Sequence, residues 1–254
     1  MLENDSLNIN NTVIEGIPAI IVTPKECKEK LPVVIHYHGW SSKKENHMML
    51  ASTLALNGYG VIVPDALYHG ERGVLDYSSK ESVVEHFWPI IFCNIEESKK
   101  LIDYAIKELK ADENSIAVMG HSMGGFTTAG IFVRHPELKT AVNINGSSAY
   151  EKSLELMVEP FKDDISKEQL EACIRDIRAY DPIKHKEAFK ERPYLIIHGE
   201  KDEVVPKEGQ EYFYEQIKKV APEKLRFTKY PRVNHYITIG MLEEALLWLK
   251  DNLG

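Results

Sequence analysis

The sequence predicts an α/β fold in which helices cover both faces of a mostly parallel sheet. Short apolar segments alternate with longer amphipathic segments along most of the 254 residues, as strands alternate with helices in such folds. Strands of a parallel sheet are buried on both faces, which accounts for the apolar character of the short segments. A chain of this length can form one sizeable core, so we expect a single domain over residues 1–254.

The N-terminal part follows a different pattern from the rest. Alternating stretches within residues 6–23 predict an antiparallel hairpin at one edge of the sheet. The buried strands are expected at 32–37, 60–64, 115–119, 140–144, 194–197 and 225–230, and the main helices at 46–57, 91–109, 123–134, 209–220 and 239–249. We expect Pro89 in the first turn of the helix that follows it, where its missing N–H has no cost.

One connection is too long for a single helix and its two loops. Residues 149–192 are charged, and their Leu and Ile spacing predicts two or three helices inserted over the sheet. We expect this helical insertion to act as a lid over the active site. A surface insertion without a functional role is the alternative.

Composition narrows the class of partner. The net charge is −8 and no run of five or more Lys and Arg occurs, which disfavours nucleic acid as a partner. The first residues lack the pattern of a signal peptide, and no run approaches the roughly 18 apolar residues of a membrane span. Cys27, Cys93 and Cys173 are far apart and match no zinc spacing. We therefore expect a cytoplasmic protein with free thiols, no membrane contact and no metal.

The most informative motif is the pentapeptide Gly120-His121-Ser122-Met123-Gly124, which has the form GxSxG. It lies between a predicted strand and a predicted helix, the context in which a nucleophilic serine stands on a tight, strained turn. Such a turn requires neighbours without side chains, and Gly120 and Gly124 meet that requirement. Taken alone, the motif is also compatible with a glycine-rich helix start that packs on a sheet.

Polar residues follow four of the predicted strands. His38-Gly39-Trp40 follows the first buried strand, Ser122 the third, Asp202 the fifth, and His235 the sixth. Ligands of open parallel sheets bind beyond the carboxyl ends of the strands. We therefore expect these groups to form one site.

The order Ser122, Asp202, His235, with His38-Gly39 ahead of the GxSxG motif, resembles the α/β-hydrolases over essentially the whole chain. The segments that carry the closer resemblance, to single-domain esterases related to dienelactone hydrolase and to prolyl-peptidase catalytic domains, are Gly39-Trp40, Pro64-Asp65, Tyr68-His69-Gly70, His198 to Asp202 and Val205-Pro206. Dienelactone hydrolase has a cysteine nucleophile. The serine in this chain favours a general serine esterase.

The resemblance implies a role for each residue of the site. Ser122 would attack the ester carbonyl, His235 would accept and return its proton, and Asp202 would orient His235. Glu200 and Glu203 are the alternatives for the acid, whereas Asn143 and Asn145 occupy a rarer acid position and cannot supply a carboxylate.

The resemblance also implies an oxyanion hole, formed by the backbone N–H groups of Trp40 and Met123. The indole of Trp40 would form either pocket wall or core. No metal and no organic cofactor is required.

The substrate pocket is predicted from an apolar segment, residues 87–92. Together with Leu154, Met157 and Val158 it would hold an acyl or alcohol group, although core packing is the more common use of such a stripe. Our candidates for substrate contacts are His69, His121, Trp88 and Phe92. His36 and His38 share a strand face, but no further acid and histidine cluster accompanies them, so we expect no metal ligation.

These observations predict a serine carboxylesterase that hydrolyses small to medium carboxylic esters through an acyl-enzyme, with a small-molecule ester as its partner. A thioesterase, a lactonase or a small-peptide hydrolase would use the same triad. A ligand-binding homologue without catalytic activity is the alternative from a different class of protein.

Overall fold

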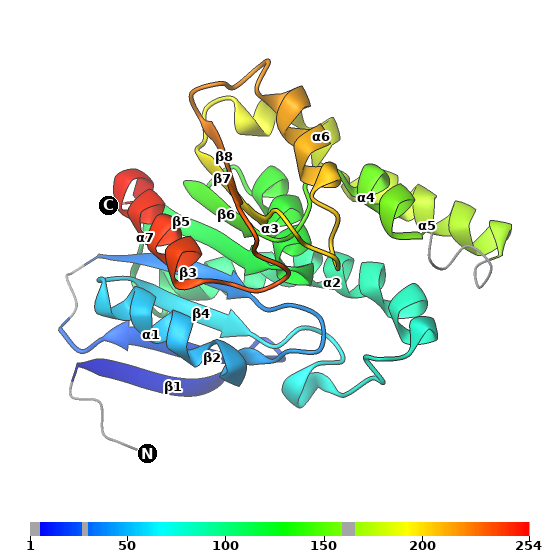
Figure 1. Cartoon of the computed structure of the whole chain (residues 1–254). Coiled ribbons are helices and arrows are strands. Elements are labelled where there is room, and N and C mark those ends of the chain that lie inside the picture. The colour runs from blue at the N-terminus through cyan, green and yellow to red at the C-terminus, as the bar shows by residue number, and fades with distance from the viewer. Residues whose placement is uncertain (1–5, 27–29, 159–165, 254) are drawn as a thin grey trace.

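The computed structural model describes residues 6–26, 30–158 and 166–253. Within these ranges eight strands form one sheet in the order β1-β2-β4-β3-β5-β6-β7-β8 (Figure 1). Their bounds are β1 Leu7–Ile14, β2 Ile17–Pro24, β3 Leu31–Tyr37, β4 Gly60–Pro64, β5 Ala111–His121, β6 Thr140–Ile144, β7 Tyr194–Gly199 and β8 Leu225–Tyr230. Strands β3 to β8 are parallel to one another, and β2 pairs antiparallel with both β1 and β4. The predicted mostly parallel sheet with an antiparallel edge hairpin is confirmed.

The hairpin at the edge turns through two residues. Glu15 and Gly16 have φ angles of 45° and 88°, and two left-handed residues make a turn whose twist matches that of the flanking strands. The register then pairs Ile14 with Ile17 directly across the turn.

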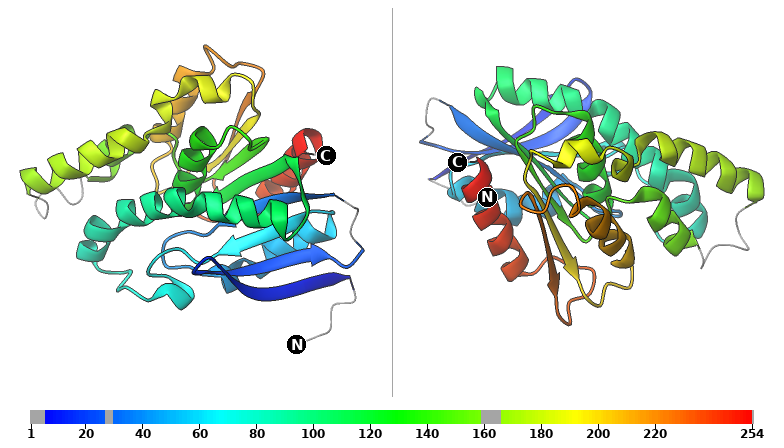
Figure 2. Two further views of the ribbon diagram at one scale, coloured as in Figure 1. Left: turned by 180° about the vertical axis from the view of Figure 1, so that it is seen from behind. Right: turned by 90° about the horizontal axis from the view of Figure 1, so that it is seen from above.

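Helices cover the two faces of the sheet as separate layers (Figure 2). One face carries α1 (Met48–Leu56) and α7 (Ile239–Leu253), and the other carries α2 (Lys80–Lys107), α3 (Met123–Arg134) and α6 (Glu208–Ile217). Every residue of β4 and β6 is buried between these layers. Burial on both faces explains why the parallel strands read as continuous apolar segments.

The longest helix begins earlier than the sequence predicts. The expected helix at 91–109 is α2, which starts at residue 80, where the Ser79 side chain accepts a hydrogen bond from a backbone N–H of the first turn. Pro89 therefore lies inside the helix and not in its first turn, so that prediction was wrong. Phe87 and Trp88 are buried in the core. The stabilisation from burying this apolar side of the helix exceeds the cost of the hydrogen bond that Pro89 cannot donate.

The insertion between β6 and β7 contains α4 (Tyr150–Val158) and α5 (Lys167–Tyr180), followed by the short 3-10 turns η4 (Pro182–Lys184) and η5 (Lys186–Phe189). Residues 159–165 of the predicted insertion lie outside the described residues. Helices α4 and α5 project beyond the edge at which the parallel strands end (Figure 1). In the described ranges no helix has both the length and the apolar character needed to cross a membrane.

A buried ion pair joins two loops at the carboxyl edge of the sheet. Lys44 lies in the 3-10 turn η1 (Lys44–His47), and its Nζ is 2.7 Å from Oδ2 of Asp65, which follows β4. The carboxylate of Asp65 also accepts the backbone N–H groups of Lys44 and Glu71, each at 3.0 Å. Burial alone would raise the pKa of Asp65, but these hydrogen bonds and the charge of Lys44 hold it below its usual value.

We predict that Lys44→Met lowers the free energy of unfolding by about 3–5 kcal/mol, because it leaves the carboxylate of Asp65 buried without its cation. Urea unfolding measures the change. Lys152→Met is the control, since Lys152 pairs with Glu155 at the surface and such pairs contribute less than about 1 kcal/mol. Equal losses in the two variants would show that the buried pair does not hold the loops together.

Candidate active site

Ser122 stands on a sharp turn between β5 and α3. Its φ and ψ angles are 58° and −123°, a region that costs a non-glycine residue on the order of 1–3 kcal/mol. A Cβ atom on Gly120 would lie 2.1 Å from the carbonyl oxygen of Gly124, and one on Gly124 would lie 2.0 Å from that of Tyr37. Both glycines are therefore required by close approach of the backbone, as the sequence predicts for such a turn. The turn places Ser122 at the carboxyl edge of the sheet.

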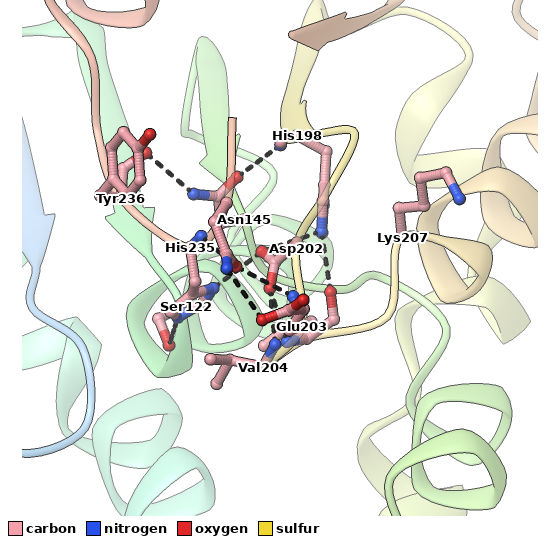
Figure 3. Close-up of polar contacts among 12 residues, drawn as sticks. Ser122, Asn145, His198, Asp202, Glu203, Val204, Lys207, His235 and Tyr236 are labelled. Atoms are coloured by element: carbon pink, nitrogen blue, oxygen red, sulfur yellow. Dashed lines mark hydrogen bonds and ion pairs between the residues drawn. The ribbon is translucent and has the colours of Figure 1, made fainter. Parts of the chain in front are cut away.

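A chain of hydrogen bonds joins the three predicted triad residues (Figure 3). Oγ of Ser122 lies 2.7 Å from Nε2 of His235, and Nδ1 of His235 lies 2.7 Å from Oδ2 of Asp202. Because an ionised carboxylate only accepts, Nδ1 carries the proton and Nε2 is free to accept from the serine hydroxyl. The structure thus brings together residues that are 113 positions apart in the chain.

Asp202 is held as an anion by several donors. Its Oδ1 accepts the backbone N–H groups of Val204 and Val205 at 2.9 and 2.8 Å, and Nε2 of His198 lies 3.3 Å from Oδ2. Burial opposes ionisation, but the hydrogen bonds from His198, His235 and the backbone outweigh it and keep the pKa of Asp202 well below its usual range. The carboxylate that reaches His235 is therefore a stable negative charge.

The two alternative acids lie elsewhere. Glu203 is exposed, and its carboxylate accepts a hydrogen bond from the Asn234 side chain at 3.1 Å. Glu200 is also exposed at the surface.

Two backbone N–H groups near Ser122 have no acceptor among the described residues. Met123 follows Ser122 directly, and Trp40 follows Gly39, where a Cβ atom would lie 3.1 Å from Cβ of Ser122. In the part of the chain that the structure describes, neither the N–H of Trp40 nor that of Met123 has a hydrogen-bond acceptor. Free N–H groups in this position are what an oxyanion requires.

The Trp40 side chain is fixed by its neighbours. Its Nε1 donates to the carbonyl oxygen of Tyr77 at 3.0 Å, and its ring packs edge-on against those of His69 and Tyr77. His69 is itself buried, donates from Nδ1 to the Leu67 carbonyl at 2.9 Å and stacks on Tyr77. His69 thus supports the loop of Trp40 and makes no hydrogen bond to the triad among the described residues.

His121 lies beside the triad histidine. The centroids of the His121 and His235 rings are 5.0 Å apart, and Nε2 of His121 is 3.4 Å from Nδ2 of Asn145. Burial, together with the nearby His235, lowers the pKa of His121 to about 3. His121 is therefore neutral at physiological pH and places no positive charge next to His235.

An apolar pocket of about 270 Å³ lies between α2 and the pair α4 and α5. Its lining includes most of the predicted pocket residues, namely Phe87, Trp88, Leu154, Met157 and Val158. Phe92 lies outside this lining, and its ring stacks on Tyr180 at 4.3 Å. Phe92 lies one helical turn beyond Trp88 and reaches α5 instead, so its contact with substrate stays a prediction.

Phe87 connects the pocket to the loop of Trp40. Its ring centroid is 6.1 Å from that of Trp40 and 5.5 Å from that of Phe126, which lies in the first turn of α3. The pocket therefore begins one aromatic ring away from the loop that carries Trp40.

His36 in β3 and His38, just beyond the end of β3, bind protein groups. Nε2 of His36 lies 2.8 Å from Nδ1 of His47, and Nε2 of His38 accepts the backbone N–H of Ala66 at 3.0 Å. Across the described ranges, no group of three or more His, Cys, Asp or Glu side chains is arranged to hold a metal ion.

One buried residue of the site had no role in the sequence analysis. From the sequence, Asn145 is only a position that lacks a carboxylate, yet its side chain contacts three of the loops that form the site. The signal that could have found it is its place directly after the strand 140–144, at the same edge as Ser122.

Comparison with known proteins gives concordant results. The model of the dienelactone hydrolase family matches residues 17–238. YitV of Bacillus subtilis (strain 168) is 30% identical over 256 residues, which cover 97% of this chain and 100% of YitV. Esterase YjfP of Escherichia coli (strain K12) is 28% identical over 251 residues, which cover 97% of this chain and 100% of YjfP.

Among solved structures, TT1662 from Thermus thermophilus is similar with a TM-score of 0.78 at 21% identity, covering 96% of this chain and 97% of its own. The strands and helices thus have the arrangement of the α/β-hydrolases, as the sequence predicts.

The lowered pKa of Asp202 makes a prediction about stability and pH. A carboxyl whose folded pKa lies below its unfolded value of about 3.9 stabilises the fold fully above that value and loses the contribution as pH falls through the folded pKa. We expect Asp202→Asn to lower the free energy of unfolding at pH 7, with the difference from wild type narrowing at pH 3. Urea unfolding at both pH values tests this, with Asp251→Asn, at an exposed position of α7, as the control. A difference that widens at pH 3 would contradict the assignment.

Proposed function

Because the chain belongs to the dienelactone hydrolase family and is a hydrolase, we propose that it is a serine carboxylesterase acting on small to medium carboxylic esters. The observation that supports this most strongly is the hydrogen-bonded chain from Ser122 through His235 to Asp202. The relative YjfP, which matches along its whole length, is named as an esterase. No metal or organic cofactor takes part in the proposed reaction.

The first half of the reaction forms an acyl-enzyme. Oγ of Ser122 attacks the ester carbonyl carbon while its proton passes to Nε2 of His235, 2.7 Å away. Asp202 stabilises the resulting imidazolium and stays ionised. The bond from the carbonyl carbon to the alcohol oxygen then breaks, and His235 gives its proton to the leaving alcohol.

The second half releases the acid. His235 accepts a proton from water, the hydroxide attacks the acyl carbon, and the bond to Oγ of Ser122 breaks as the proton returns to the serine. In both halves the carbonyl oxygen carries negative charge in the transition state. The backbone N–H groups of Trp40 and Met123 stabilise that charge, a contribution of about 2.7–4 kcal/mol for one such donor in other hydrolases.

The apolar pocket supports the proposal that the substrate is an ester with an apolar group. It lies next to Phe87, which contacts the loop of Trp40, and its walls come from α2, α4 and α5. In this proposal the helical insertion of a single domain forms one side of the pocket for the acyl or alcohol group. Thioesters, lactones and small peptides would meet the same triad, and matched ester, thioester, lactone and aminoacyl-amide substrates distinguish these activities.

We predict that Ser122→Ala abolishes turnover of activated esters and that Asp202→Asn retains more activity. In serine proteases, loss of the nucleophile costs roughly 10⁶ in kcat and neutralising the acid roughly 10⁴. Steady-state kinetics with 4-nitrophenyl acetate measures both variants. The reverse ranking would contradict the roles given to the two residues.

Labelling with a fluorophosphonate provides a companion test that needs no substrate. We expect the folded wild type and Ser78→Ala, which alters an exposed serine bonded to Asp76, to be labelled, and Ser122→Ala to remain unlabelled. Absence of label on the folded wild type would favour a homologue that binds ligands without catalysis.

The pocket makes a separate prediction about chain length. Met157→Trp fills part of the pocket and should lower kcat/KM for 4-nitrophenyl octanoate about 10-fold, because each excluded methylene loses about 0.8 kcal/mol. The acetate, which is too short to enter, should be hydrolysed as before. Met49→Trp, at an exposed methionine of α1, is the control. An equal loss for acetate and octanoate would show that this pocket does not hold the acyl chain. Esters with a long alcohol then test whether the pocket holds the alcohol group instead.

A further inference from the structure

Asn145 occupies a buried position at the end of β6, among the loops of the proposed triad. Its φ angle is 49°, in the left-handed region that asparagine tolerates better than most residues other than glycine. Its backbone N–H continues the sheet by donating to the carbonyl oxygen of Ile197 at 2.9 Å. The side chain is fully buried and makes three polar contacts, of which the contact with Tyr236 can be followed in Figure 3.

The orientation of the Asn145 amide follows from its partners. Oδ1 accepts the backbone N–H of Gly199 at 2.9 Å, and a backbone N–H can only donate. Nδ2 therefore faces the carbonyl oxygen of Tyr236 at 3.3 Å and Nε2 of His121 at 3.4 Å. Each of the two amide protons has an acceptor, so every polar atom of the side chain is used.

Each contact of Asn145 leads to a different triad residue. Gly199 ends β7, and its carbonyl accepts the backbone N–H of Asp202 at 3.2 Å. Tyr236 directly follows His235. His121 directly precedes Ser122, and its ring lies 5.0 Å from that of His235. One buried amide thus joins the loops of the acid, the base and the nucleophile.

Of the three loops, the one that carries His235 and Tyr236 depends most on its contact with Asn145. Tyr236 is 54% exposed, and the residues before His235 bond mainly to the acid loop, through Val233 to Lys201 and Asn234 to Glu203. The contact from Asn145 connects this exposed loop to the buried end of β6.

We propose that Asn145 is a positioning residue, which fixes His235 between Ser122 and Asp202 by hydrogen-bonding the three loops at once. It touches neither the substrate nor the reacting atoms. The inference rests on the proposed esterase function, because it assigns a role within that triad.

Two variants separate the side chain from the backbone. Asn145→Gly removes the amide without straining the left-handed φ. Asn145→Asp keeps the acceptor for Gly199 and the shape of the side chain, but it places a carboxylate oxygen against the carbonyl oxygen of Tyr236. Asn143→Ala is the matched control. Asn143 is a buried asparagine two residues earlier, in β6, and its Nδ2 lies within hydrogen-bond distance of Gly125, Ser148 and Tyr194 and of none of the three groups that Asn145 bonds.

The kinetic test measures kcat and KM with 4-nitrophenyl acetate. We expect Asn145→Gly and Asn145→Asp to lower kcat about 10²-fold, the loss that a displacement of about 1 Å produces, with KM within about twofold of wild type. Asn143→Ala should lower the melting temperature and keep kcat within about threefold. If both Asn145 variants keep kcat within threefold, or if Asn143→Ala loses kcat equally, the positioning role is wrong.

A proton NMR measurement reports on His235 without any substrate. The Nδ1 proton between His235 and Asp202 should give a low-field resonance in the wild type and in Asn143→Ala, absent in His235→Ala. It should shift or disappear in Asn145→Gly. An unchanged resonance in Asn145→Gly overturns the inference even if kcat falls. If Asn145→Gly does not fold, Asn145→Asp is measured in its place.

The two proposals fail separately. If the wild type hydrolyses no ester and takes no fluorophosphonate label, the esterase function is wrong, and the His235 resonance alone then decides whether Asn145 positions that ring.

Discussion

The site depends on one steric constraint, the left-handed turn at Ser122. That turn exists only because the backbone of α3 approaches within contact distance of β5 and β3, with Gly120 and Gly124 at the points of closest approach. It raises Oγ of Ser122 above the edge of the sheet and leaves the N–H of Met123 without an acceptor among the described residues. The strain energy of the backbone at Ser122 is offset by the stabilisation from packing of the two helix layers on the sheet.

Buried polar groups hold the loops around this turn. The carboxylate of Asp202 accepts two backbone N–H groups and contacts two histidine rings, and this arrangement orients His235. The pair of Lys44 and Asp65 fastens the loop that follows β3, and Trp40 lies in that loop. Because unpaired buried charges are costly, each network has few alternative arrangements. The geometry that the proposed chemistry needs is therefore built into the stability of the fold.

Much of the fold was predictable because its signals are local. The apolar strands, the edge hairpin and the glycines around Ser122 each follow from short segments, and the order of Ser122, Asp202 and His235 follows from the strands that precede them. The early start of α2 was missed because Pro89 is a strong local signal, which burial against the rest of the molecule overrides. The contacts of Asn145 could not be predicted, since they depend on three loops that meet only in the folded chain.

In the proposed reaction Ser122 carries the acyl group of the substrate during turnover. Rapid mixing of the protein with excess 4-nitrophenyl acetate, followed by acid quenching, proteolytic digestion and mass analysis of the peptides, tests for this acyl-enzyme. With this activated ester we expect deacylation to be the slower half, which gives a burst of 4-nitrophenol that approaches one equivalent and a single acetyl adduct on the peptide that contains Ser122. Hydrolysis that proceeds with no burst and no adduct on this peptide, at any quench time, would contradict it.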